Sequence, residues 1–159
     1  MEEGKTKKKV MVAIDESECS HYALHWALDN LRETISDSQL FIFNAQPLPT
    51  YLSASTYGAP PADLITTVQE NQKKVALALL EKAKEICANH GVEAETMKEV
   101  GDPKEAICDA VEKLKIELLI LGSNGRGAIQ RAFLGSVSNH CVHNAKCPVL
   151  VVRKPAWKN

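Results

Sequence analysis

A glycine-rich segment near the C-terminus of this 159-residue chain has the residue types and spacing of an anion-binding turn. Gly122, Gly125 and Gly127 have no side chains, so the backbone here can adopt positive φ and come close to a ligand. Successive exposed N–H groups in such a turn form a concave surface that binds anions. A plain glycine-rich connection between a strand and a helix fits the composition equally well, so both interpretations stay open.

Gly135 and Ser136 open an expected helix shortly after this turn. The first N–H groups of a helix are unpaired and lie at the positive end of its dipole, so they favour a negatively charged ligand. Ser136 and Ser138 add hydroxyl donors. The stretch 122–138 also contains Arg126, a second arginine and no acidic residue. A polyphosphate is the ligand that suits this set of groups.

Two common phosphate-binding motifs are absent from the sequence. The Walker-type motif G-x-x-x-x-G-K-[ST] does not occur. The motif G-x-G-x-x-G does not follow the first expected strand, which runs instead into Asp15, Glu16 and Ser17. The sequence therefore disfavours both a P-loop NTPase and a dinucleotide-binding domain.

Strand and helix patterns alternate along the chain. Short continuous apolar runs are typical of strands buried on both faces, and apolar residues three and four apart are typical of helices. Expected strands cover the apolar runs 9–14, 40–43, 118–121 and 148–152, and a further strand with one exposed face is expected over 92–100, where apolar and polar residues alternate loosely. Expected helices cover 23–31, 63–90, 102–114 and 136–144. This alternation indicates an α/β fold with a parallel sheet and helices on both of its faces.

Local signals mark where several helices begin and which face they bury. Ser17 or Ser20 can cap the first helix. Asp102 is the expected N-cap of the third, with Pro103 at its first position and Glu105 completing a pair that resembles a capping box. The buried stripe of the long helix is expected to consist of Leu64, Val68, Val75, Leu79, Ala83 and Ile86.

Polar or small residues follow three of the expected strands. Asp15 follows the first strand, Asn44 and Ala45 follow the second, and Gly122 follows the fourth. The carboxyl ends of parallel strands meet at one edge of the sheet, which is where α/β proteins bind ligands. Asp15 could also simply cap the turn that it begins. We expect these strand ends and the glycine-rich turn to form one site.

The residues of this segment resemble the ATP-binding motif of the universal stress protein family. Gly122-x2-Gly125-x9-Gly135-Ser136 is similar to the motif of the nucleotide-binding branch of that family. The resemblance extends to the sequences around the other strands, namely 12–15, 100–103, 134–138 and 147–152. It covers about Lys9 to Arg153, and the proline-rich loop at 47–62 resembles small plant members with a single domain.

The resemblance implies a fold and a division of the chain. It implies an open five-stranded parallel sheet in the order 3-2-1-4-5, of the Rossmann-like, adenine nucleotide alpha hydrolase-like kind. We expect one domain over 9–153, a flexible N-terminal tail over 1–8 and a C-terminal tail over 154–159.

The resemblance also implies roles for individual residues. Asp15 is expected to bind the ribose hydroxyls or a magnesium ion, Ala45 to contact adenine through its backbone, and Gly122 to pack against ribose. The full expected set of nucleotide contacts is Ala13, Asp15, Ala45, Gly122, Ser123, Gly125, Arg126, Gly127, Gly135, Ser136, Val137 and Ser138. Asn44-Ala45 departs from the usual His-Val, and Asn124 stands where a basic residue is common.

The implied function is regulation of a stress response through binding of ATP or of its products AMP and ADP. One alternative is slow ATP hydrolysis, although no residue is evidently placed as a general base. A second alternative is a thiol-responsive chaperone in which the nucleotide is secondary, because the chain has five cysteines.

Composition limits partners and location. The formal net charge of -1 gives no reason to expect nucleic acid or an anionic membrane as partner, and no apolar stretch is long enough to span a membrane. The odd number of cysteines and the polar N-terminus favour the cytoplasm, while the basic run 5–9 leaves a nuclear location open.

Two further features could bind a metal ion or a second protein chain. His140, Cys141, His143 and Cys147 look like metal ligands, but their spacing does not match a known zinc site, and a helix with one buried cysteine is the favoured interpretation. The last strand, with Val149, Leu150, Val151 and Val152, is apolar and carries no charge, so at a sheet edge it is expected to pair with a second copy. The tail 154–159 could cover it instead.

Overall fold

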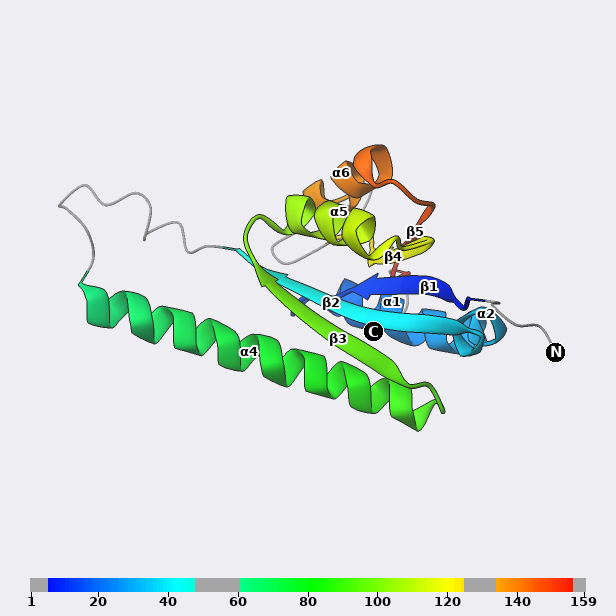
Figure 1. Ribbon diagram of the computed structural model, residues 1–159, viewed down its shortest axis with the longest axis horizontal. Coiled ribbons are helices and arrows are strands. Elements are labelled where there is room, and N and C mark those ends of the chain that lie inside the picture. Colours follow the sequence, from blue (N-terminus) through cyan, green and yellow to red (C-terminus); the bar gives the residue numbers. More distant parts are fainter. Residues whose placement is uncertain (1–5, 48–60, 125–133, 156–159) are drawn as a thin grey trace.

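The computed structural model describes residues 6–47, 61–124 and 134–155, and it contains one five-stranded sheet (Figure 1). The sheet has the order β3-β2-β1-β4-β5, and all neighbouring strands are parallel. The strands are β1 (Lys8–Ala13), β2 (Ser38–Gln46), β3 (Ala94–Val100), β4 (Leu118–Gly122) and β5 (Val149–Val152). The helices are α1 (Glu18–Asn30), α2 (Arg32–Ser36), α4 (Ala62–Asn89), α5 (Pro103–Leu114) and α6 (Ser136–Asn144). The predicted fold class and strand order are confirmed.

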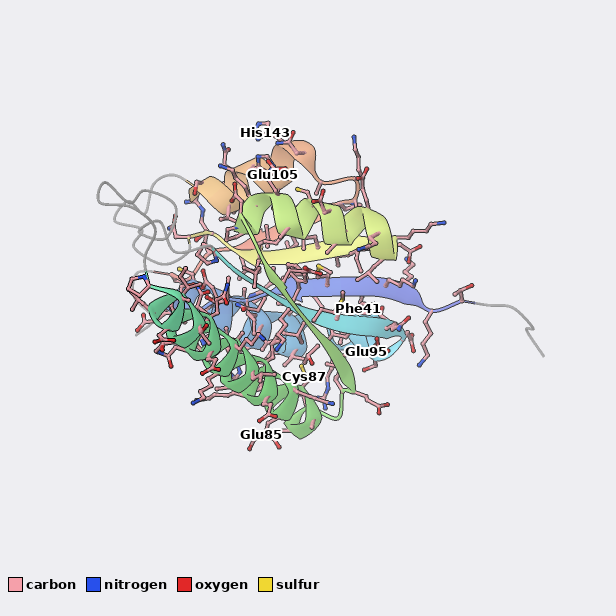
Figure 2. All side chains as sticks on the ribbon, turned by 60° about the vertical axis from the view of Figure 1, so that its left-hand side comes forward. Phe41, Glu85, Cys87, Glu95, Glu105 and His143 are labelled. Atoms are coloured by element: carbon pink, nitrogen blue, oxygen red, sulfur yellow. The ribbon has the colours of Figure 1, made fainter. Side chains whose placement is uncertain are left out.

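Two apolar layers enclose the sheet, as a parallel sheet requires. Alternate strand residues point to opposite faces, so Val10 and Val12 join α1 and α4, while Met11 joins α5 and α6. Figure 2 shows Cys87 on the α4 side and Glu105 on the opposite, α5 side. β1 is the middle strand and is the most completely enclosed, since Met11 and Val12 have no exposed surface.

The predicted helix starts are confirmed for α1 and α5, with one difference in detail. Ser17 caps α1, and its side chain accepts a hydrogen bond from the Ser20 N–H at 3.2 Å. Asp102 occupies the N-cap position of α5 and Pro103 its first position. The expected capping-box pairing is wrong, because the Asp102 side chain makes no capping hydrogen bond and its Oδ2 lies 3.8 Å from Nζ of Lys104.

The predicted buried face of α4 is correct only in part. This helix buries Ala76, Leu80, Ala83 and Cys87, of which Ala83 was predicted, while Leu79 and Ile86 of the predicted stripe are partly buried and pack against the same core. Leu64 and Val75 from the predicted stripe remain 45% and 44% exposed. At 3.6 residues per turn the two stripes lie roughly a quarter of a turn apart, and the first half of α4 extends past the sheet (Figure 1). Burial is therefore decided by where the sheet ends, not by the apolar pattern alone.

Candidate functional site

Three strand ends meet at the carboxyl edge of the sheet because β1 lies between β2 and β4. The Ile14 N–H donates to the Phe43 carbonyl at 2.8 Å, which holds the exit of β1 against β2. On the other side, the Ser123 N–H donates to the Val152 carbonyl at 3.0 Å, which holds the exit of β4 against β5. The residues that sequence analysis placed after these strands are thus brought to one edge.

Asp15 lies half-buried at the exit of β1 and begins the turn into α1. Its Oδ1 accepts a hydrogen bond from the Ser17 N–H at 2.7 Å, so the turn-capping interpretation is confirmed. Among the described residues, no donor contacts its other carboxylate oxygen, Oδ2. Asp15 therefore stabilises the start of the β1–α1 turn through one of its two carboxylate oxygens.

Ser20 fixes the backbone of Asp15 and was missed as a site residue by sequence analysis. It is buried, and its hydroxyl oxygen accepts a hydrogen bond from the Asp15 N–H at 3.0 Å. The same hydroxyl can donate to the Asp15 carbonyl at 2.9 Å. The Ser17 carbonyl, at 3.2 Å, is the alternative acceptor for the hydroxyl hydrogen of Ser20. The only signal in the sequence is a serine three positions after the N-cap, which is too common to identify this role.

The end of β2 carries two buried amide side chains that lock it to β1. Asn44, which is 1% exposed, donates from Nδ2 to the Ile14 carbonyl at 2.9 Å. Gln46 donates from Nε2 to Oδ1 of Asn44 at 3.1 Å. This chain of hydrogen bonds fixes the distance between the exits of the two strands.

Ala45 lies between these two amides with its backbone directed toward β1. The Phe43 carbonyl bonds to β1, whereas the Gln46 carbonyl accepts the Gly101 N–H at 2.9 Å on the β3 side. Successive residues of a strand direct their backbone groups to alternate sides, so the N–H and carbonyl of Ala45 point toward β1. They lie beyond Ala13↔Phe43, the last pair in the β1–β2 register. An edge with one donor and one acceptor is therefore presented beside Asp15.

Gly122 is required by the approach of α1. A β-carbon added here would lie 2.7 Å from both the carbonyl carbon and the carbonyl oxygen of Cys19, and 2.9 Å from the Ser20 nitrogen. These are backbone atoms of the first turn of α1, which cannot move aside. Gly122 does not adopt positive φ, so the expectation of a left-handed backbone is wrong at this position. A glycine at position 122 therefore allows α1 to pack closely against the end of β4.

Ser138 joins the start of α6 to the end of β4. Its buried hydroxyl donates to the Ser123 carbonyl at 2.7 Å, and the Gly135 N–H donates to the same carbonyl at 2.7 Å. A β-carbon at Gly135 would lie 3.2 Å from Cα of Asn124, so little space remains at this junction. The hydroxyl of Ser138 is thus engaged within the protein.

The first turn of α6 faces the same edge and contains no acidic residue. Gly135 is the N-cap and makes no side-chain capping bond, while Ser136 is exposed and Val137 is half-buried. Ala13 is buried at the end of β1. Three residues of the predicted set, Gly125, Arg126 and Gly127, lie outside the described residues.

The comparisons with known proteins identify the family of the chain. Residues 7–153 match the model of the universal stress protein family. The chain belongs to this family. A universal stress protein A-like protein from Arabidopsis thaliana is 32% identical over 165 residues, which cover 96% of this chain and 94% of that protein. The predicted resemblance is confirmed.

Solved structures of universal stress proteins share the fold. A universal stress protein family protein from Arabidopsis thaliana, solved with AMP bound, is 28% identical with a TM-score of 0.67, covering 94% of this chain and 93% of that one. UspA from Lactobacillus plantarum is 22% identical with a TM-score of 0.77, covering 93% and 99%. The second likeness concerns the fold alone.

One histidine of this universal stress protein lies near the edge. His21 follows Ser20 on α1, and burial, Lys82 and His25 together hold its pKa below the ordinary value, while Asp15 opposes that shift. The negative charge of Asp15 is therefore close enough to act on His21. Protonation of His21 is disfavoured at the carboxyl edge.

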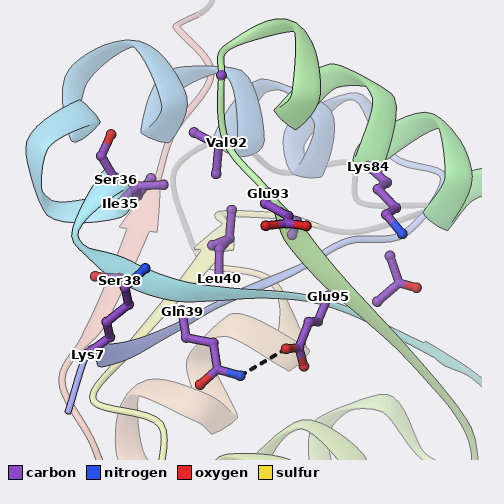
Figure 3. A pocket seen from close by; sticks show the side chains of 13 residues that line it. Lys7, Ile35, Ser36, Ser38, Gln39, Leu40, Lys84, Val92, Glu93 and Glu95 are labelled. Atoms are coloured by element: carbon purple, nitrogen blue, oxygen red, sulfur yellow. Dashed lines mark hydrogen bonds between the residues drawn. The ribbon is translucent and has the colours of Figure 1, made fainter. Parts of the chain in front are cut away.

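The opposite, amino edge of the sheet carries a broad hollow of about 1000 Å³ (Figure 3). Charged side chains line it, among them Lys7, Lys84 and Glu93. Nε2 of Gln39 donates to Oε1 of Glu95 at 3.0 Å across its floor. Because ligands of open α/β sheets bind at the carboxyl edge, this hollow is not the candidate site.

The histidine and cysteine cluster on α6 has its own internal contacts. Nε2 of His140 lies 3.6 Å from Oε1 of Glu105, and Nδ1 of His143 lies 2.8 Å from the Asn139 carbonyl. Cys141 is buried. The ranges 6–47, 61–124 and 134–155 bring together no group of three side chains that could hold a metal ion. No helix within them is both long and apolar enough to cross a bilayer.

Proposed function

We propose that this universal stress protein binds an adenine nucleotide at the carboxyl edge of its sheet. The observation that carries the proposal is the position of Asp15, whose Oδ1 alone is used by the turn, at the strand exit next to Ala45, whose backbone points toward β1 beyond the last β1–β2 pair. A ribose and a base joined to it require these two kinds of group side by side. The AMP bound to the Arabidopsis relative, which has the same fold, supports this choice of ligand.

The individual contacts follow from the chemistry of each group. The N–H and carbonyl of Ala45 match the acceptor and donor on the Watson–Crick edge of adenine. Oδ2 of Asp15 accepts a ribose hydroxyl, and Ala13 and Gly122 form the floor beneath the sugar. The first turn of α6, with Gly135, Ser136 and Val137, faces the phosphates with its free N–H groups. Ser123 and Ser138 hold this turn in place.

ATP with a magnesium ion is the form of the ligand that we favour. Mg²⁺ prefers hard oxygen ligands and binds through one or two carboxylates together with phosphate oxygens. Asp15 supplies such a carboxylate, so the donor set fits the ion. Gly125, Arg126 and Gly127 complete the phosphate-binding turn in this proposal. The protein would act by holding ATP, ADP or AMP and signalling its occupancy in a stress response.

The substitution Asp15→Asn tests the site. It keeps an oxygen that can accept the Ser17 N–H but removes the charge that ribose or magnesium would meet. We expect affinity for ATP with Mg²⁺, measured by calorimetry, to fall about 10-fold, which corresponds to about 1.4 kcal/mol. Glu95→Gln removes a charge at the amino edge and is the matched control with unchanged affinity. Equal affinity of Asp15→Asn and the parent protein would contradict the proposal, and repeating both titrations without Mg²⁺ separates the ribose from the metal contribution.

We also propose that two copies pair through β5. This strand lies at the edge of the sheet, and Val149, Leu150 and Val151 are only half-buried. A partner strand related by a two-fold axis would cover this apolar edge symmetrically. We expect a dimer by light scattering, and we expect Val151→Lys to give a monomer. A dimer that survives this change would place the interface elsewhere. The five free cysteines are compatible with a reducing cytoplasm, which is the location we propose.

A further inference from the structure

Three of the five cysteines gather on the α5 and α6 side of the sheet. Cys108 lies on α5, Cys141 lies on α6, and Cys147 lies just before β5, all within one apolar cluster. α5 and α6 pack against each other, and a side-chain interaction between the two thiols lowers the pKa of Cys108 and raises the pKa of Cys141. The two thiols therefore lie near each other where α5 and α6 pack together.

The other two cysteines are separate from this group. Cys87 is buried on α4 in the core on the opposite face of the sheet, as Figure 2 shows. Cys19 lies in the first turn of α1, beside Gly122 at the carboxyl edge. The contact between Cys108 and Cys141 is thus a local property of the α5–α6 layer, and the sheet separates it from Cys87.

We propose that Cys108 and Cys141 are a site of oxidative modification, at which a peroxide converts the two thiols into a disulfide bond between α5 and α6. The thiol of Cys108 first loses its proton, and the thiolate attacks hydrogen peroxide; the O–O bond breaks to give a sulfenic acid and hydroxide, which takes up the released proton and leaves as water. The sulfur of Cys141 then attacks the sulfenic sulfur, forming the S–S bond and releasing a second water. Two thiols lose two electrons and two protons, and one peroxide is reduced to two waters.

The exposure of the two sulfurs sets the order of these steps. Cys108 is half-buried and reaches solvent, whereas Cys141 has no exposed surface. Peroxide therefore meets Cys108 first, and the inner sulfur of Cys141 resolves the sulfenic acid. Formation of the link requires the two sulfurs to approach to an S–S bond length of about 2 Å, which rotation of the two side chains at the α5–α6 contact has to supply. The proposal does not depend on nucleotide binding.

The electrostatic surroundings make the reaction slow at neutral pH and faster in alkali. Burial raises the pKa of Cys108, the Cys141 hydrogen bond lowers it, and the carboxylates of Glu105, Asp109 and Glu112 raise it further. Burial also raises the pKa of Cys141, to about 12. Since only the thiolate attacks peroxide, the rate should rise with pH up to the pKa of Cys108. This behaviour fits a response to sustained oxidation.

Cys147 is the competing partner. It is half-buried, and its pKa is raised by burial, with an opposing hydrogen bond to the backbone of Leu119. No hydrogen bond joins its thiol to Cys108 or Cys141 among the described residues, although its charge acts on Cys141. A disulfide that includes Cys147 is therefore an outcome that the experiment must distinguish.

The test is oxidation of the full-length reduced protein with hydrogen peroxide at neutral pH and at about pH 9, where more of each thiol is ionised. We expect the intact mass to fall by two hydrogen atoms, faster at the higher pH, and peptide mapping to place one link between Cys108 and Cys141. The rate should not depend on protein concentration, because the reaction is intramolecular. A link that includes Cys147, or sulfinic acid at Cys108 without any link, would overturn the proposal.

Variants sharpen the assignment. We expect Cys108→Ser and Cys141→Ala each to abolish the mapped link, while Cys87→Ala, the matched buried control on the other face, retains it. The oxidised parent protein should also show a higher urea midpoint than the reduced one, because the link restricts the unfolded chain. An unchanged or lower midpoint would mean that the link strains the α5–α6 packing, which contradicts a site arranged for it. The mapping on the parent protein decides the matter even where a variant fails to fold.

Discussion

The two edges of the sheet are both polar, but they are built in different ways. At the carboxyl edge, the buried side chains of Ser20, Asn44 and Ser138 bond to backbone groups and fix the strand exits. At the amino edge, the hydroxyl of buried Ser38 also donates to the Thr34 carbonyl, but the half-buried Gln39 and the exposed Glu95 bond to each other through their side chains beside a hollow. Backbone-anchored groups hold a fixed geometry, whereas exposed side chains can rearrange at little cost. The difference indicates that the carboxyl edge is the preorganised one.

The largest expected difference between the edges concerns two glycines. Gly122→Ala places a β-carbon 2.7 Å from backbone atoms of α1, so we expect the free energy of unfolding to fall by about 3 kcal/mol. Gly91 lines the hollow and has open space around an added β-carbon, but its φ is +72°. Gly91→Ala should therefore cost only about 1 kcal/mol. Urea denaturation measures both, and equal losses would show that the edges do not differ in rigidity.

The two amide side chains give the next largest difference. Asn44→Ala removes the partner of the Ile14 carbonyl and of the Gln46 amide in a buried place, so we expect a loss of about 2 kcal/mol. Gln39→Ala removes an exposed hydrogen bond to Glu95 and should cost less than about 0.5 kcal/mol. Thermal and urea unfolding of the two variants under the same conditions provide the comparison. A larger loss for Gln39→Ala would reverse the conclusion about the two edges.

The smallest expected effect depends on pH and involves His21. Its pKa in the folded protein lies below 6.5, so just below that pH the unfolded chain binds more protons than the folded one. The contribution of neutral His21 to stability is therefore complete above pH 6.5 and decreases as the pH falls through the window below it. We expect His21→Gln to lose less stability than the parent protein on acidification. His143→Gln, at an exposed position on α6, is the control and should behave as the parent protein does.

The sequence predicted the sheet well because β1, β2, β4 and β5 contain apolar runs and their ends are marked, whereas the mostly exposed β3 shows only a loose alternation. α6 begins and ends where it was predicted, at Ser136 and Asn144. α2 was missed, because five residues carry too little periodic pattern to indicate a helix. The buried face of α4 was assigned only in part, because its apolar residues cover a broad face and contact with the sheet decides which of them are fully buried.

The site was predicted less completely than the fold, for a physical reason. Residue types predicted that Asp15 and Ala45 lie at strand ends, where the structure has them, since position along a strand can be read from the pattern. Ser20 and Gln46 act through hydrogen bonds to backbone groups elsewhere in the chain or to another buried amide, and nothing local distinguishes them from ordinary surface residues. Gly122 was predicted to let the backbone come close to a ligand. The structure shows that the absence of a side chain at this position makes room for the backbone of α1.

Because β1 is the middle strand, the ribosome must synthesise most of the chain before the sheet can be completed. Val10 pairs with Leu40 on one side and with Leu118 on the other. At about 5–20 residues per second, the second partner follows Val10 by roughly 5–20 s. During that interval the β4-facing side of Val10, Met11 and Val12 has no strand to pair with. Nascent chains of this protein should therefore be clients of ribosome-associated chaperones until the C-terminal third emerges.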